Sequence, residues 1–152
     1  MSITILAVGK KHEDWVENGI LRYETRLKRP YDVKWLLLPH SSFEGSRARQ
    51  EESERILSRL TNNDFVILLD ERGVNLTSPS LSELFSQALV RGKSIVCIIG
   101  GAYGVDETVH SRADTIWSLS HLVFPHQLVR LIVTEQIYRS QEIARGGRYH
   151  HE

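Results

Sequence analysis

The chain has 152 residues, which is long enough to close one hydrophobic core. Of these residues 41% are hydrophobic and 25% are charged, a composition typical of globular proteins. Its 19 Lys and Arg residues equal its 19 Asp and Glu residues. This balance excludes a polybasic protein that coats nucleic acid by charge alone, and it excludes an acidic disordered chain.

A single cysteine and the lack of a long apolar run exclude further classes. One thiol, Cys97, can form neither an internal disulfide nor a cysteine-based zinc cage, and its apolar neighbours predict that it is buried. No apolar stretch reaches the roughly 18 residues that cross a bilayer. The first residues resemble a strand and not a secretion signal. We therefore expect one cytoplasmic domain over residues 1–152, with no membrane segment.

The first half of the chain alternates apolar runs with amphipathic segments. The helix-like segments have apolar residues on one face, and proline and glycine separate the elements. In chain order, the patterns predict a strand at 3–8, a helix at 15–27, a strand at 33–38, a charged surface helix at 47–60, and a strand at 65–69 that ends in Asp70 and a turn at 71–73.

The second half continues the alternation. Pro79 and the capping-box spacing of Ser80 and Glu83 predict a helix start, and Gly92 predicts its end. The remaining elements are a strand at 94–99, a glycine turn at 100–104, a short helix capped by Asp106, a strand at 115–119, an irregular segment at 120–125, a long helix at 126–143 and a tail at 144–152.

Strands that alternate with helices predict an α/β fold with a mostly parallel sheet and helices on both faces. Nearly continuous hydrophobic strands agree, because a sheet covered on both faces needs no polar side. Ligands of such folds bind outside the carboxyl ends of the strands. We therefore expect chemistry in the loops after Leu69, Ile99 and Leu119.

Two of these loops carry candidate ligand groups. The glycines at 100, 101 and 104 would let backbone N–H groups approach a ligand, although their spacing fits neither a dinucleotide nor a P-loop signature. Asp70 could accept a phosphoryl group, but the acidic metal ligands that this chemistry needs are missing after the first strand. An aspartate that caps the following turn is the favoured interpretation. His121 and His126 do not have zinc-ligand spacing, so no metal site is expected.

The C-terminal region suggests two kinds of contact. The helix at 126–143 has more apolar residues than one core contact requires, which favours burial on both sides or a homodimer, and we expect the homodimer. The tail combines Arg145, Arg148 and Tyr149, a set that can pair with phosphate and stack on a base. The alternative is a solvated, frayed terminus.

Three blocks, at 65–70, 98–104 and 117–130, resemble the RlmH family, the ribosomal RNA large subunit methyltransferases H of the SPOUT superfamily. Shorter matches at 7–10, 135–139 and 149–150 extend the resemblance over the whole chain in order. The resemblance implies a C-terminal trefoil knot, a homodimer and S-adenosylmethionine as methyl donor. It also implies methylation at N3 of a pseudouridine, of the position 1915 type, in 23S ribosomal RNA on the assembled ribosome.

The resemblance also implies roles for individual residues. The cofactor-binding residues would be Leu69, Gly101, Ser120, His121, Leu122, Val123, Phe124 and Pro125. Beyond the resemblance, we hypothesise that Tyr149 and His150 lie over the cofactor and assist catalysis, and that Arg139, Arg145, Arg148 and His151 hold RNA. Many relatives have Arg or Lys where this chain has His151, and a histidine is only partly charged near neutral pH.

Two alternatives stay open. One is a SPOUT methyltransferase that acts on transfer RNA, which the lack of an added RNA-binding domain disfavours. The other is a non-enzymatic α/β binding module built around Asp70. Because the net charge is zero, we expect isolated RNA to be a poor substrate compared with a ribosomal particle.

Overall fold

A computed structural model of the chain describes residues 2–151. Within these residues the elements are β1 (Ile3–Val8), α1 (Asp14–Glu24), β2 (Val33–Leu38), α2 (Gly45–Leu57), β3 (Asp64–Asn75), α3 (Ser78–Val90), β4 (Ser94–Ile99), α4 (Glu107–Arg112), β5 (Thr115–Ser118) and α5 (His126–Ala144). The five strands described there form one sheet in the order β2-β1-β4-β3-β5, and every pair is parallel. The predicted α/β class with a parallel sheet is confirmed.

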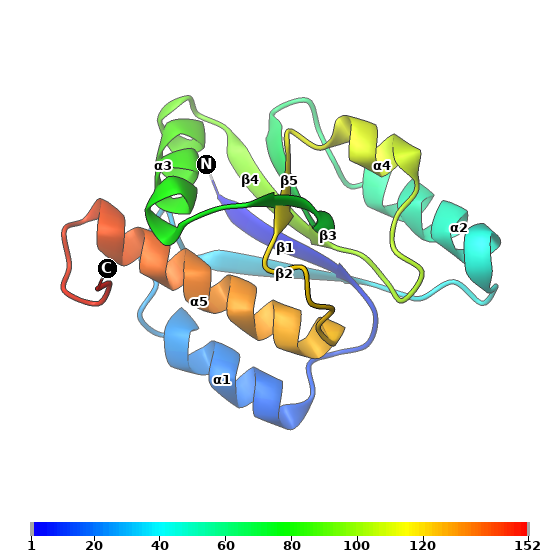
Figure 1. Cartoon of the computed structure of the whole chain (residues 1–152), viewed down its shortest axis with the longest axis horizontal. Helices are drawn as coiled ribbons and strands as arrows, with labels where there is room; N and C mark the ends of the chain where they lie inside the picture. The colour runs from blue at the N-terminus through cyan, green and yellow to red at the C-terminus, as the bar shows by residue number, and fades with distance from the viewer. Residues whose placement is uncertain (1, 152) are drawn as a thin grey trace.

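Helices cover both faces of this sheet (Figure 1). On one face, α3 and α5 pack over inward side chains such as Ile5 and Ile67, and α1 packs against α5. On the other face, α2 and α4 pack over Leu6 and Ile98. Because alternate residues of β1 enter two separate apolar clusters, both sides of the strand are buried, as its sequence predicts.

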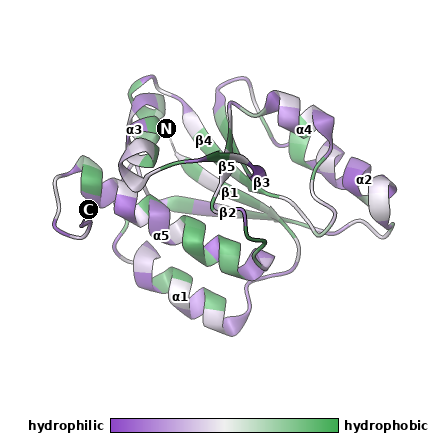
Figure 2. Ribbon diagram, in the orientation of Figure 1, coloured by the Kyte–Doolittle hydropathy of each residue, from purple (hydrophilic) through white to green (hydrophobic). Residues whose placement is uncertain are grey.

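The long helix α5 lies between α1 and α3. Figure 2 shows that hydrophobic residues are concentrated in its first half. Val133 and Ile137 are fully buried, whereas Leu128, Leu131 and Ile132 remain partly exposed. Neighbouring helices of the same chain therefore cover much of the apolar surface that suggested a second subunit.

Two helices end earlier than their patterns predict, and side-chain hydrogen bonds account for both ends. After α1, Gln141 of α5 accepts the N–H of Lys28 at 2.7 Å and donates to the carbonyl of Arg26 at 3.1 Å. These backbone groups are therefore satisfied without further helical turns. After α2, the Ser58 hydroxyl donates to the carbonyl of Arg55 at 2.7 Å.

The structure corrects the predicted cap of one helix and confirms the predicted cap of another. The cap of α3 is Thr77, whose Oγ1 accepts the N–H of Ser80 at 3.1 Å, so the predicted box that begins at Ser80 is wrong by three residues. Asp106 caps α4 as predicted, since its carboxylate accepts the N–H of Thr108 at 3.0 Å.

The predicted turn at 71–73 is wrong, because β3 stays extended to Asn75. Strand β5 pairs with Leu69 and resumes pairing at Val74, so the intervening residues form a register shift and not a chain reversal. At Gly73 the two backbones approach so closely that an added Cβ would overlap the carbonyl of Ile116. The absence of a side chain at this position lets β3 cross over β5 and continue past the end of β4.

Candidate active site

A cavity of about 470 Å³ lies at the carboxyl ends of β3, β4 and β5. Its volume is within the range of small-molecule sites. The structure brings six of the eight predicted cofactor residues into its lining: Leu69, Gly101, Ser120, Leu122, Val123 and Phe124. His121 and Pro125 belong to the same loop but do not line the cavity.

The glycine turn after β4 forms one wall. Gly101 and Gly104 make an isolated antiparallel bridge, and the N–H of Gly104 donates to the carbonyl of Gly101 at 3.0 Å. Gly104 has a φ of +73°, which glycine adopts at little cost. An added Cβ at Gly101 would lie 2.6 Å from Oε1 of Glu52, so the turn is packed directly against helix α2.

The loop between β5 and α5 forms the opposite wall. The Ser118 hydroxyl donates to the carbonyl of Ser120 at 2.9 Å, and the Ser120 hydroxyl accepts the N–H of Leu122 at 3.0 Å. These bonds fix the loop while Leu122 and Val123 remain 69% and 80% exposed. Exposed apolar side chains beside a cavity are typical of a surface that a ligand or a second protein covers.

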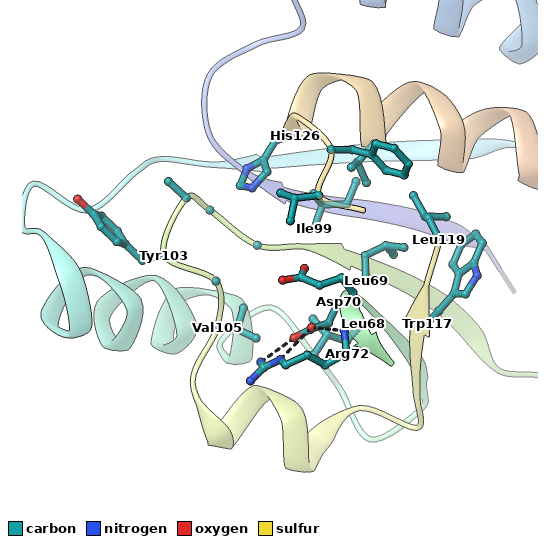
Figure 3. Close-up of a pocket in the computed structure, with 18 of the residues that line it drawn as sticks. Leu68, Leu69, Asp70, Arg72, Ile99, Tyr103, Val105, Trp117, Leu119 and His126 are labelled. Carbon is teal, nitrogen blue, oxygen red and sulfur yellow. Dashed lines mark hydrogen bonds and ion pairs between the residues drawn. The ribbon is translucent and has the colours of Figure 1, made fainter. Parts of the chain in front are cut away.

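The polar floor of the cavity is an ion-paired cluster (Figure 3). Asp70 accepts two hydrogen bonds from the Arg72 guanidinium, at 2.8 and 3.1 Å, and one from its backbone N–H at 2.9 Å. His110 lies 3.2 Å from the same carboxylate. Hydrogen bonds from Arg72 hold the pKa of Asp70 below its usual range. Asp70 is therefore committed to Arg72 and is not a free nucleophile, but the turn that it was expected to cap is replaced by the continuation of β3.

Other polar groups of the cavity wall are uncommitted. Arg49 from α2, Tyr103 from the glycine turn and His126 from the start of α5 all line the cavity. None of their three side chains has a hydrogen bond or ion pair with another residue in the range 2–151. Sequence reasoning missed Arg49, because nothing in a charged surface helix marks the one arginine that faces a distant loop. For His126, the sequence signal was its position directly after the loop that leaves the carboxyl end of a strand, where ligands of α/β folds bind.

Two charged side chains are buried beside this wall. Arg130 is 1% exposed, and its Nη1 donates to the carbonyl of Lys10 at 2.8 Å and lies 3.2 Å from Nδ1 of His12. Glu52 is 2% exposed, and its Oε2 accepts the N–H of Ser41 at 2.9 Å. Burial lowers the pKa of Arg130, with an opposing contribution from Glu13.

The predicted catalytic and RNA-binding residues of the tail do not line the cavity of their own chain. The Tyr149 hydroxyl donates to Oε2 of Glu135 at 2.7 Å, and Arg139 binds the same carboxylate at 2.7 Å. Nδ1 of His150 lies 3.1 Å from Nη1 of Arg139. Glu135 is nine residues beyond the cavity residue His126, about 14 Å along the helix axis. Figure 1 places the tail at the end of α5 opposite the loop that precedes it.

The cations of the tail differ in exposure. Arg139 is mostly covered and ion-paired, whereas Arg145 is exposed and lies 3.5 Å from a Glu142 oxygen. Arg148 and His151 are exposed. The region therefore presents a small basic surface around the end of α5.

The described residues contain no group of three or more His, Cys, Asp or Glu side chains that could hold a metal ion. In the same part of the chain, no helix is both long and apolar enough to cross a membrane. Cys97 is buried as predicted, and burial raises the pKa of its thiol to about 12.

Comparison with known families gives a match over residues 1–150 to the model of predicted SPOUT methyltransferases. The chain belongs to this family. It is therefore a methyltransferase, and the predicted enzyme class is confirmed. The family model covers the cavity, both of its loops and nearly all of the tail.

Full-length relatives narrow the family. A protein of Acetivibrio thermocellus named ribosomal RNA large subunit methyltransferase H is 37% identical, with 99% of each chain aligned. A protein of Carboxydothermus hydrogenoformans with the same name is 41% identical at the same coverage. The resemblance to the RlmH family is confirmed by these matches.

Among solved structures, a TrmH/SpoU tRNA-modifying enzyme of A. aeolicus matches with a TM-score of 0.51 at 14% identity. The match covers 95% of this chain and 77% of that one. At this identity the likeness concerns the fold alone, and it agrees with the α/β architecture.

Proposed function

We propose that the protein transfers the methyl group of S-adenosylmethionine to N3 of a pseudouridine in 23S large-subunit ribosomal RNA. The observation that carries this proposal is the full-length similarity, at 37–41% identity, to proteins named ribosomal RNA large subunit methyltransferase H. The cavity at the carboxyl ends of β3, β4 and β5 supports it, because it provides the expected place for a methyl donor.

The cavity residues fit such a donor. Leu69, Ile99 and Phe124 give apolar walls for an adenine ring. The turn at Gly101 and the loop at 120–125 bring backbone groups to the same space, which can hydrogen-bond polar ends of the ligand. His121 and Pro125 belong to the same loop, but their side chains are outside the lining.

For this reaction the protein mainly has to align the methyl group with the ring nitrogen that attacks it. S-adenosylmethionine supplies an activated methyl group, and the walls of the cavity orient it toward the incoming ring nitrogen. The ring N–H is a weak nucleophile until its proton leaves, so a proton acceptor is also needed. The Asp70–Arg72 pair keeps its own hydrogen bonds and serves to fix the floor.

The tail takes part in a homodimer in this proposal. Because Tyr149 and His150 are bonded near Glu135 and Arg139 and do not line the cavity of their own chain, they would assist catalysis at the site of a partner copy. Arg139, Arg145, Arg148 and His151 lie near them and would hold RNA there. The exposed Leu122 and Val123 give the dimer an apolar surface to cover.

Three further features belong to the same proposal. The polypeptide acts as one domain over residues 1–152. The loop at 119–125 and α5 form the C-terminal trefoil knot of the family. The enzyme works in the cytoplasm. Its substrate is the assembled ribosome, because a chain with zero net charge attracts bare RNA only weakly.

The test uses ribosomes from a strain that lacks the gene. We expect purified protein to transfer one labelled methyl group from S-adenosylmethionine to their large-subunit RNA, and mass mapping to place it on a pseudouridine. Isolated RNA and transfer RNA are the comparison substrates. Transfer to transfer RNA alone would instead support the alternative SPOUT activity. A protein that bound no S-adenosylmethionine in calorimetry would favour the binding module.

A further inference from the structure

The uncommitted polar groups of the cavity wall differ in what they can do to a substrate. Arg49 donates hydrogen bonds but does not take up a proton at neutral pH. Tyr103 has an exposed side chain on the glycine turn, and a phenol is protonated at neutral pH. His126 is the one group of these three whose side chain accepts a proton within the physiological range.

The surroundings of His126 keep its imidazole available as an acceptor. Charged or titratable groups face it from three elements: Arg130 one turn further along α5, Glu52 from α2, and His40 after β2. Burial lowers the pKa of His126 first, Arg130 and His40 lower it further, and Glu52 opposes them. The first turn of a helix also disfavours a positive charge. The imidazole is therefore neutral near pH 7.

Other candidate acceptors are less suited. The Asp70 carboxylate is occupied by Arg72 and His110, and its lowered pKa makes it a weak base. The Tyr149 hydroxyl is bonded to Glu135, and burial together with that bond raises its pKa. Glu71 lines the cavity but is exposed to water.

We propose that His126 is the catalytic base that removes the ring-nitrogen proton of the target base during methyl transfer, an inference that rests on the proposed function. The N–H proton moves to an imidazole nitrogen, and the electron pair left on the ring nitrogen forms the new N–CH₃ bond. The S–CH₃ bond breaks with its electron pair on sulfur, which leaves S-adenosylhomocysteine. The imidazolium returns its proton to water. Buried Glu52 stabilises the charged imidazole, and buried Arg130 restores the neutral form.

The experiment measures single-turnover methyl transfer to ribosomes at saturating S-adenosylmethionine between about pH 6 and 9. For His126→Gln we expect a rate about 10²–10⁴-fold below wild type at neutral pH. The deficit should shrink as the pH rises, because hydroxide replaces the lost base. Calorimetry should give the same affinity for S-adenosylmethionine. Arg91→Gln, which removes a charge from an exposed residue after α3 that does not line the cavity, is the control and should keep the wild-type pH profile.

Several outcomes would overturn the inference. A His126→Gln rate close to wild type removes the need for this base, and a profile parallel to wild type indicates a structural role. Weaker cofactor binding with an unchanged rate at saturation assigns His126 to the cofactor. If both His126→Gln and His126→Asn fail to fold, the wild-type profile decides: a rate that levels off after the imidazole deprotonates supports the base, and one that keeps rising refutes it. An inactive wild type instead refutes the proposed function itself.

Discussion

Replacement of Gly101 by alanine perturbs the cavity wall in a way that can be worked out from the structure. The new Cβ would lie 2.6 Å from Oε1 of Glu52 and 3.2 Å from Cγ1 of Val8. Ordinary van der Waals contact begins at 3.4 Å, so the carboxylate or the turn must move by about 0.8 Å. Gly101 is not among the glycines with positive φ, so the cost is steric and not conformational.

The expected loss is about 1–3 kcal/mol, the usual range for overpacking a buried contact. At about 2–4 °C per kcal/mol for a chain of this size, the melting temperature should fall by roughly 2–12 °C. The affinity for S-adenosylmethionine should also fall, because the displaced turn lines the cavity. Thermal unfolding and calorimetry measure the two effects.

Two control variants distinguish the steric effect of the Gly101 contact with Glu52 from the general effect of replacing a glycine by alanine. Gly92 has a φ of +76° and nothing within 4 Å of an added Cβ. Gly92→Ala should therefore cost about 1–2 kcal/mol through its backbone alone and leave cofactor affinity unchanged. Shortening the partner with Glu52→Asp should recover part of the Gly101→Ala loss in the double variant. A Gly101→Ala protein with wild-type stability and affinity would refute the reasoning.

Three further predictions concern groups away from this contact. The pKa of Asp70 is lowered in the folded state, so the stability that this carboxylate contributes is complete above its ordinary pKa of 3.8 and is lost as the pH falls through the folded value. Asp70→Asn should lower the free energy of unfolding in urea by about 1 kcal/mol at pH 7, a small amount because Arg72 is largely exposed. The difference in stability between wild type and variant should narrow below about pH 4. Tyr149→Phe removes the bond to Glu135 and should speed carboxypeptidase digestion of the tail with little change in melting temperature, whereas unchanged digestion would contradict the proposed anchor. Cys97 should react with a thiol reagent only at the rate of global unfolding, and fast labelling of the native protein would contradict its burial.

The elements that the sequence predicted well are those in which local pattern and final environment agree. The strands at 3–8, 33–38 and 94–99 match β1, β2 and β4 residue for residue, because apolar runs of this length between breakers have few other uses. The start of α4 at Asp106 follows from a cap that acts over two residues. Local chemistry was sufficient in these cases.

The errors arise where a distant segment decides the local structure. The turn expected at 71–73 is strand because β5 resumes pairing with β3 beyond the register shift. Helix α1 stops early because Gln141, more than a hundred residues later, satisfies the backbone at Arg26 and Lys28. Arg49 faces the cavity for the same kind of reason, since the packing of α2 against the glycine turn is a tertiary contact.

The close approach of Gly73 to the backbone of Ile116 limits which positions around the cavity can be varied. Loops around the cavity can vary in length and chemistry, but the carbonyl of Ile116 leaves no room for any side chain at position 73. A substitution there would push β5 away from β3 and displace the loop that begins at Leu119. Libraries that seek new methyl acceptors should therefore diversify Arg49, Tyr103 and Val123 while position 73 remains glycine.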